Sequence, residues 1–220
     1  MEGTAPDPSQ LEFVLSPDAS TIEMRRRADY DLYVRRVPAP LIVLVHGPVR
    51  GAITRPREWP VYRGYGALAA NAGAAAAIAD LDYTDTHALD GPTLQLERLV
   101  DAARFENGID SGRVVVWAFS GGARLVGRWL EQPPEWLRGL ALTYPAAPTV
   151  ARVAAPLVIT RVGVEHPKIQ ASVDHLLAVA PTAEIIHVPE GQHGFDMLDH
   201  NAESREAVAR ALEAVTALLV

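Results

Sequence analysis

One stretch of the sequence, residues 113–125, constrains the fold more than any other. The apolar, β-branched run over residues 114–119 ends in Ser120, and an amphipathic pattern begins directly after it. This change of pattern predicts a strand that turns abruptly into a helix, with Ser120 at the turn. Such a turn is a place where a protein can hold a nucleophile.

The predicted turn requires small residues on both sides of Ser120. A strand and a helix approach closely around a serine with a strained backbone, so the residues two before and two after it must lack large side chains. They are Ala118 and Gly122. The usual pattern is Gly-Xaa-Ser-Xaa-Gly, in which Ala118 replaces the first glycine. Because small residues also follow strands for packing reasons, the pentapeptide alone leaves a catalytic and a structural serine open.

Composition excludes several classes of protein. The chain has 220 residues, no cysteine and a formal net charge of -7. The lack of cysteine excludes disulfides, thiolate metal sites and a cysteine nucleophile. The negative charge argues against nucleic acid and anionic membranes as partners, since both select basic surfaces. No apolar stretch reaches membrane-spanning length and the opening lacks a secretory signal, so we expect a cytoplasmic protein without a membrane partner.

The order of the apolar segments predicts one α/β domain. We expect a poorly ordered start over residues 1–20, which contain three prolines, and a single domain over residues 21–220. Between residues 21 and 36 lie two segments in which polar and apolar residues alternate. They predict a hairpin with one face exposed to solvent. Strands and helices then alternate, which predicts a doubly wound, mostly parallel sheet with helices on both faces. The later strands are expected at residues 41–45, 74–79, 114–119, 140–144, 157–160 and 184–188.

A serine hydroxyl needs a base to take its proton and a carboxylate to orient that base. In a sheet of this kind both follow the serine in chain order, each in a loop after a later strand. His193 lies among glycines after the strand at residues 184–188 and before the closing helix at residues 204–219, where the base belongs. A surface histidine in a turn is the alternative.

The choice of the acid is limited because one stretch of the chain contains no carboxylate. No Asp or Glu occurs between residues 140 and 164, so the first carboxylate after the strand at residues 157–160 is Glu165. Glu165 is therefore the candidate acid, and a surface glutamate beside a proline is the alternative reading. Asp196 is the runner-up acid, but three residues after His193 it suits a helix-entry or loop-stabilising group better.

The ordered set of motifs resembles the α/β-hydrolase superfamily, and most closely its dienelactone hydrolase-like branch. The resemblance covers most of the chain and implies the α/β-hydrolase fold, with Ser120 as nucleophile, His193 as general base and Glu165 as acid. Dienelactone hydrolases have a cysteine in place of Ser120, so their lactone substrate is not implied. The matching motifs are His46-Gly47 and residues 118–122, 163–165 and 191–195.

The oxyanion of a tetrahedral intermediate needs two hydrogen-bond donors. The family resemblance assigns one of them to the backbone N–H of Gly121. The second usually comes from the loop after His46-Gly47, but the next residue is Pro48, which has no N–H. Either Val49 or a later loop residue supplies the second donor, or the oxyanion site is altered.

The chain has no room for a cap domain, because the link between Tyr144 and Leu157 is short. The loop over residues 48–59 is therefore expected to form one wall of the substrate pocket, with Trp59, Tyr62 and Arg57 as candidate contacts. Packing of Trp59 on the following helix is an equal alternative.

Three functional hypotheses follow for the sequence. The first is a serine hydrolase that cleaves a small ester, thioester or lactone through an acyl-enzyme, without metal or cofactor. The second, favoured by Pro48, is an acyltransferase, eliminase or cyclase that acts on a biosynthetic intermediate. The third is a non-catalytic binding protein. We expect a small-molecule substrate as partner, and the sequence is compatible with a homodimer.

Overall fold

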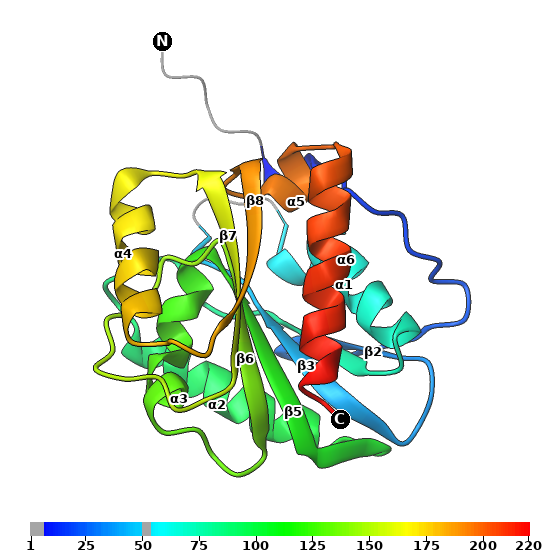
Figure 1. The fold of residues 1–220 in the computed structure, drawn as a ribbon. Helices are drawn as coiled ribbons and strands as arrows, with labels where there is room; N and C mark the ends of the chain where they lie inside the picture. Colours follow the sequence, from blue (N-terminus) through cyan, green and yellow to red (C-terminus); the bar gives the residue numbers. More distant parts are fainter. Residues whose placement is uncertain (1–6, 50–53) are drawn as a thin grey trace.

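The structure, a computed structural model, describes residues 7–49 and 54–220. Within these residues eight strands form one sheet in the order β1-β2-β4-β3-β5-β6-β7-β8 (Figure 1). All neighbours from β4 to β8 in this order are parallel, whereas β2 pairs antiparallel with both β1 and β4. The strands are β1 (Glu23–Arg26), β2 (Tyr30–Val34), β3 (Ala39–Val45), β4 (Ala75–Ala79), β5 (Ile109–Phe119), β6 (Leu137–Thr143), β7 (Leu157–Val164) and β8 (Glu184–Gln192).

Helices cover both faces of the sheet, which confirms the predicted doubly wound architecture (Figure 1). On one face α1 and α6 bury side chains such as Tyr65 and Val208. On the other face α2, α3 and α4 contribute Leu96, Leu130 and Leu176 to a second core. The α-helices are α1 (Pro60–Asn71), α2 (Asp90–Arg104), α3 (Gly127–Glu131), α4 (Pro167–Ala178), α5 (Phe195–Leu198) and α6 (Ala202–Ala217), and three 3₁₀ helices are η1 (Pro8–Gln10), η2 (Pro56–Glu58) and η3 (Ser120–Val126), all within the described residues.

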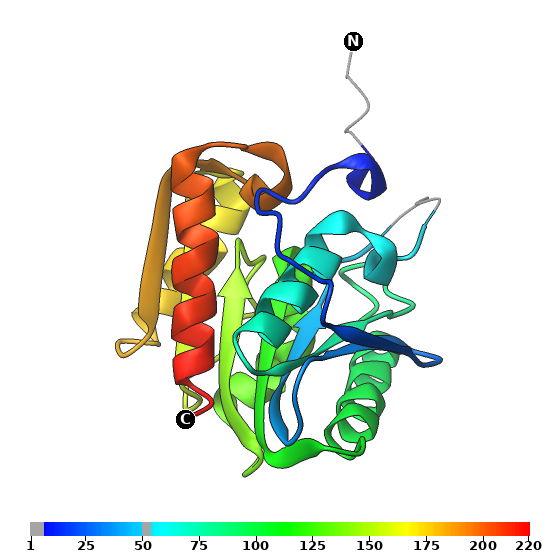
Figure 2. The same cartoon turned by 90° about the vertical axis from the view of Figure 1, so that its right-hand side faces the viewer.

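The start of the chain differs from the expectation of poor order over residues 1–20. Residues 1–6 lie outside the described ranges, but Phe13 and Val14 are buried. The Phe13 ring lies 4.8 Å from the ring of Tyr65, and the Val14 amide donates to the carbonyl of Asp196 at 2.9 Å. Figure 2 shows this segment passing beside α1. Two apolar side chains suffice to fix the segment, because their burial removes about 1.5–3 kcal/mol each of unfavourable hydration.

The hairpin is present at the antiparallel edge of the sheet, but its exposure differs from the prediction. Only β1 is largely exposed, whereas every residue of β2 is buried. The reason is that the side chains of β2 pack into the cores on both faces of the sheet, with Tyr30, Leu32 and Val34 in one core and Tyr33 in the other. Its buried Asp31 is neutralised by Arg26, whose guanidinium lies 3.0 Å from the carboxylate.

The segment after Ser120 is helical, but its first part is not α-helical. It runs as the 3₁₀ helix η3 before the short α3 begins at Gly127. The parallel strand β5 ends at Phe119, so the serine lies at the C-terminal edge of the sheet, where ligands bind in open α/β sheets. In residues 7–49 and 54–220, no helix has the length and apolar character that a membrane crossing requires.

Candidate active site

Ser120 occupies the sharp turn that its neighbours predict. Its φ angle is +52°, a left-handed conformation that residues other than glycine rarely adopt. A Cβ atom at Gly122 would lie 2.7 Å from the carbonyl oxygens of Val45 and His46, so only glycine fits there. Ala118 is fully buried. The strained serine is held because the end of β3 packs directly against the start of η3.

The structure brings Ser120, His193 and Glu165 together in one hydrogen-bonded row. The Ser120 Oγ lies 2.7 Å from His193 Nε2, and His193 Nδ1 lies 2.6 Å from Glu165 Oε2. The second carboxylate oxygen, Glu165 Oε1, accepts the amide of His166 at 2.7 Å. The Glu165 side chain is 6% exposed and that of His193 is 34% exposed, so the acid is shielded while the base reaches solvent. This geometry suits proton transfer from the serine to the histidine.

The loop that carries His193 is fixed on both sides of the histidine. Gln192 precedes it at the end of β8, and both its amide and its side-chain nitrogen donate to Asp199, at 3.0 and 2.7 Å. Gly194 follows with φ at +80°, a turn that leads into α5. Because β8 pairs in parallel with β7, the loops after the two strands lie side by side, and Glu165 meets His193 there.

Asp196, the alternative acid, does not contact His193 through its carboxylate. It is fully buried and accepts hydrogen bonds from the hydroxyls of Tyr65 and Tyr144, all at 3.0 Å. Burial raises the pKa of Asp196 to about 7, although the two tyrosine hydroxyls oppose this increase. Of the two candidate acids from the sequence, Glu165 contacts the imidazole of His193, whereas the carboxylate of Asp196 contacts Tyr65 and Tyr144.

His46 is buried at the end of β3 and does not belong to this row. Its Nε2 accepts the amide of Leu81 at 3.0 Å, so its proton lies on Nδ1 and is donated to the carbonyl of Gly47 at 2.6 Å. Burial lowers the pKa of His46, which keeps the ring neutral. The histidine therefore ties the loop after β3 to the residues after β4.

The expected second oxyanion donor, Val49, is engaged elsewhere. Its amide donates to the carbonyl of Tyr83 at 2.8 Å, which corrects the expectation that it faces the nucleophile. Pro48 lies against Gly121, with its Cδ atom 2.6 Å from the position that a Cβ on Gly121 would take. Since Cδ stands where other residues carry the amide hydrogen, a methylene group faces the Gly121 side of the turn.

The aromatic residues expected to touch the substrate are part of the core instead. Trp59 is 6% exposed, donates from Nε1 to the carbonyl of Thr54 at 3.2 Å and stacks on Tyr62. Tyr62 is 5% exposed and packs edge-on against Phe119. Packing of the loop onto α1, the alternative reading of Trp59, therefore describes both residues. Both rings therefore expose little surface to a bound molecule.

Arg57, the third expected contact, is held in ion pairs. Its Nε lies 2.9 Å from the buried carboxylate of Asp80, and its Nη1 lies 3.7 Å from that of Asp31. Residues 50–53 of the same loop lie outside the described ranges. Arg57 thus anchors the end of the loop to β2 and to the residue after β4.

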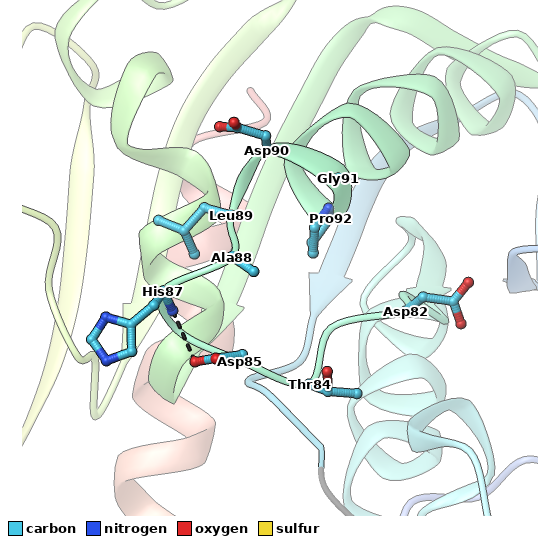
Figure 3. A pocket seen from close by; sticks show the side chains of 9 residues that line it. All are labelled: Asp82, Thr84, Asp85, His87, Ala88, Leu89, Asp90, Gly91 and Pro92. Atoms are coloured by element: carbon cyan, nitrogen blue, oxygen red, sulfur yellow. Dashed lines mark hydrogen bonds between the residues drawn. The ribbon is translucent and has the colours of Figure 1, made fainter.

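The segment after β4 borders the turn and was not identified from the sequence. The Thr86 methyl group lies 3.5 Å from the Cβ position of Gly121, and Arg124 donates to the Thr86 carbonyl at 3.4 Å. Next to it lies a surface pocket of about 480 Å³, with Asp82 and His87 on opposite sides (Figure 3). The segment lacks a periodic pattern, so the sequence held no signal for it. No group of three or more His, Asp or Glu within the described residues is placed to hold a metal ion.

The sheet order, the strained serine and the position of the row define the α/β-hydrolase fold. A bacterial heroin esterase has 14% identity and a TM-score of 0.76, over 94% of this chain and 87% of that one. The protein DphMB1 has 19% identity and a TM-score of 0.73, over 96% and 89%. A thermostable esterase from Pseudomonas putida has 15% identity and a TM-score of 0.66, over 92% and 84%. The sequence matches no family model and no curated protein.

Proposed function

We propose that this protein is a serine hydrolase that cleaves a small ester, thioester or lactone through an acyl-enzyme. The observation that carries the proposal is the row of two short contacts, 2.7 Å from Ser120 to His193 and 2.6 Å from His193 to Glu165. A hydroxyl in such a row can lose its proton to the imidazole as it attacks a carbonyl carbon. The esterases among the structural neighbours support the same class of reaction.

In the proposed mechanism Ser120 Oγ attacks the carbonyl carbon while His193 Nε2 takes its proton. The Glu165 carboxylate stabilises the imidazolium that forms, and the N–H of Gly121 stabilises the oxyanion. The intermediate collapses as the bond to the leaving group breaks, and His193 protonates that group. A water molecule then attacks the acyl-enzyme with His193 as base, which releases the acid and restores the serine.

The proposed substrate is a small molecule bound in an open site. Strand β6 ends at Thr143 and β7 begins at Leu157, with no helix or strand between them in this described part of the chain. No cap therefore covers the row at that point, and the side chain of His193 is 34% exposed. An open site places few limits on the leaving group but supplies little apolar surface for a long acyl chain.

A fluorophosphonate probe together with an aryl ester substrate tests the proposal. The wild-type protein is expected to be labelled and to hydrolyse the ester, and Ser120→Ala is expected to lose both activities. Ser20→Ala serves as the matched control, because it removes an exposed serine hydroxyl in a part of the chain far from Ser120. This variant is expected to keep both labelling and ester hydrolysis. Absence of labelling in the wild type, or equal labelling of Ser120→Ala, would rule out the proposed nucleophile.

A second candidate function is acyl transfer, elimination or cyclisation of a biosynthetic intermediate. It is favoured by the Pro48 methylene beside Gly121 and by the Val49 amide that is bonded to Tyr83. With a weaker oxyanion site, hydrolysis of an unactivated ester is slow, and an activated thioester becomes the better substrate. Product analysis with a thioester and added alcohol or amine acceptors distinguishes the two. Rapid turnover of simple aryl esters, with no product from the acceptors, favours hydrolysis.

A further inference from the structure

A buried carboxylate lies beside the candidate active site but outside the hydrogen-bonded row. Asp196 has no exposed surface and lies only three residues after His193. Its desolvation is costly, so a fold retains such a group only where hydrogen bonds compensate it. The proposed reaction leaves this carboxylate without a task, because Glu165 already meets His193 Nδ1.

The hydrogen bonds of Asp196 lead back to the imidazole through Tyr144. The Tyr144 hydroxyl lies 3.0 Å from both carboxylate oxygens of Asp196. The ring of the same tyrosine lies against His193, with 4.8 Å between ring centroids and an angle of 53° between the planes. Tyr144 therefore contacts His193 with its ring and Asp196 with its hydroxyl.

The backbone of Tyr144 is as constrained as its side chain. Its φ angle is +36°, and its amide donates to the carbonyl of Thr160 at 2.9 Å. A left-handed tyrosine persists only where surrounding contacts determine its position. The residue lies directly after β6, at the same edge of the sheet as Ser120, so its ring is presented to His193 from a rigid strand.

The imidazole needs such a support because its own loop leaves it partly open. The side chain of His193 is 34% exposed, and its two nitrogens are held only at the edges of the ring, by Ser120 and Glu165. These two contacts permit the ring to rock about the line that joins them. A second ring packed at 4.8 Å restricts that rocking motion.

We propose that Tyr144 and Asp196 form a positioning pair that holds the imidazole of His193 in line with Ser120. The inference rests on the proposed function and deepens it. Asp196 fixes the tyrosine hydroxyl, and the tyrosine ring fixes the plane of the imidazole. Neither residue exchanges a proton with the substrate, so the pair acts through His193 on the rate of proton transfer.

The structure offers a matched control for this pair. Tyr65 is buried like Tyr144 and donates to the same carboxylate, at 3.0 Å from Asp196 Oδ2, but its ring packs on Phe13, Trp117 and Phe119 and has no ring contact with His193. Loss of either hydroxyl removes a buried hydrogen bond to Asp196. Only loss of the Tyr144 hydroxyl releases the ring that touches the imidazole.

The test compares Tyr144→Phe, Asp196→Asn and Tyr65→Phe with the wild type. For Tyr144→Phe and Asp196→Asn, kcat is expected to fall about tenfold with KM within about twofold, because misplacement of a reacting group slows the chemical step. Tyr65→Phe is expected to keep kcat within about twofold while it lowers Tm as much as Tyr144→Phe does. The double variant Tyr144→Phe/Asp196→Asn is expected to lose no more activity than Asp196→Asn, since the two residues act as one unit.

Equal losses of kcat in Tyr65→Phe and Tyr144→Phe would overturn the positioning role and leave a structural one. An unchanged kcat in a folded Tyr144→Phe protein would overturn it as well. The rate of fluorophosphonate labelling separates this failure from failure of the proposed function. If the wild type is labelled at Ser120 and Tyr144→Phe is labelled equally fast, only the positioning role fails. If the wild type is not labelled, both proposals fail together.

Discussion

The two sides of the candidate site at Ser120 differ in how many hydrogen-bonding groups face the serine. On the His193 side, each member is held by further bonds, since Glu165 also accepts the His166 amide and the loop before His193 is tied to Asp199. On the other side, the loop after β3 presents a proline methylene to Gly121, and its next amide is bonded to Tyr83. In the proposed reaction the groups for proton transfer are therefore all in contact, whereas the proposed oxyanion site has one assigned backbone donor, Gly121, among the residues described.

This difference indicates which step limits the proposed reaction. A well-placed base lowers the barrier of proton transfer, but charge on the oxyanion must still be stabilised in the same transition state. One oxyanion donor is worth roughly 10²–10³ in kcat. We therefore expect that the proposed site, with its acid and base in contact and one assigned oxyanion donor, acts best on activated substrates.

The largest effect on kcat is expected from Glu165→Gln, on the side of Ser120 that carries His193. The amide keeps the shape of the carboxylate but cannot stabilise the imidazolium, so kcat is expected to fall by about 10³–10⁴-fold. Steady-state hydrolysis of an aryl ester measures it. Glu190→Gln, an exposed glutamate in β8, is the control and keeps its activity. A loss below about tenfold would show that Glu165 is not the orienting acid.

A rise in kcat is expected from Pro48→Ala, on the side of Ser120 that carries Gly121. The substitution replaces the ring methylene with an amide hydrogen beside Gly121, and we expect kcat to rise by about tenfold. The gain is smaller than the full value of a donor because the loop also loses the rigidity of proline. Hydrolysis of an unactivated ester and inhibition by a phosphonate analogue measure it. An unchanged kcat with unchanged Tm would mean that this amide does not face the oxyanion.

A pH effect on stability is expected from the carboxylate behind His193. Burial raises the pKa of Asp196 to about 7, while Tyr62, Tyr65, Tyr144 and Asp199 surround it. A raised carboxyl pKa means that the folded state binds the proton more tightly than the unfolded state. The contribution of Asp196 to stability is therefore fully present below about pH 4 and is lost as pH rises to about 7.

The variant Asp196→Asn makes this pH effect measurable, because an amide does not titrate. The difference in Tm between wild type and Asp196→Asn is expected to change in favour of the variant between pH 4 and 7 and to stay level above this interval. Thermal unfolding followed by circular dichroism at a series of pH values gives the comparison. A difference that is constant across the interval would contradict a raised pKa in the folded state.

The smallest effect on activity is expected from Arg57→Ala on the loop that follows Pro48. Arg57 pairs with the buried Asp80 and Asp31, so its loss is expected to destabilise the fold by about 1–3 kcal/mol. KM and kcat for a small ester are expected to stay within about twofold, because the side chain is committed to the fold. Urea unfolding and ester kinetics measure both, with exposed Arg36→Ala as control. A large rise in KM would return Arg57 to the substrate pocket.

Local patterns in the sequence determined much of the fold. The apolar runs at residues 41–45 and 114–119 lie within β3 and β5, because a strand buried on both faces admits no polar residue. The small residues around Ser120 predicted the strained turn, since no Cβ fits at Gly122. Glu165 is the candidate acid because residues 140–164, which include the ends of two strands after Ser120, contain no Asp or Glu.

Long-range contacts decided what these patterns left open. The sequence offered both Glu165 and Asp196 as acids, and only the packing of Tyr65 and Tyr144 around Asp196 separates them. The sequence is compatible with Val49 as the second donor, but its amide bonds to the carbonyl of Tyr83, which lies in a segment without a periodic pattern. Trp59 could line a pocket or pack inside, and its stacking on Tyr62 settles that.

The sequence by itself therefore determined the sheet, the turn at Ser120 and the chain order of the row. The tertiary structure decided which donors and acceptors are free to meet a substrate. The physical reason is that burial and backbone geometry follow local periodicity, whereas the partner of a polar group depends on segments far apart in the chain. The 2.7 Å contact of Ser120 with His193 spans 73 residues, and no local pattern encodes such a distance.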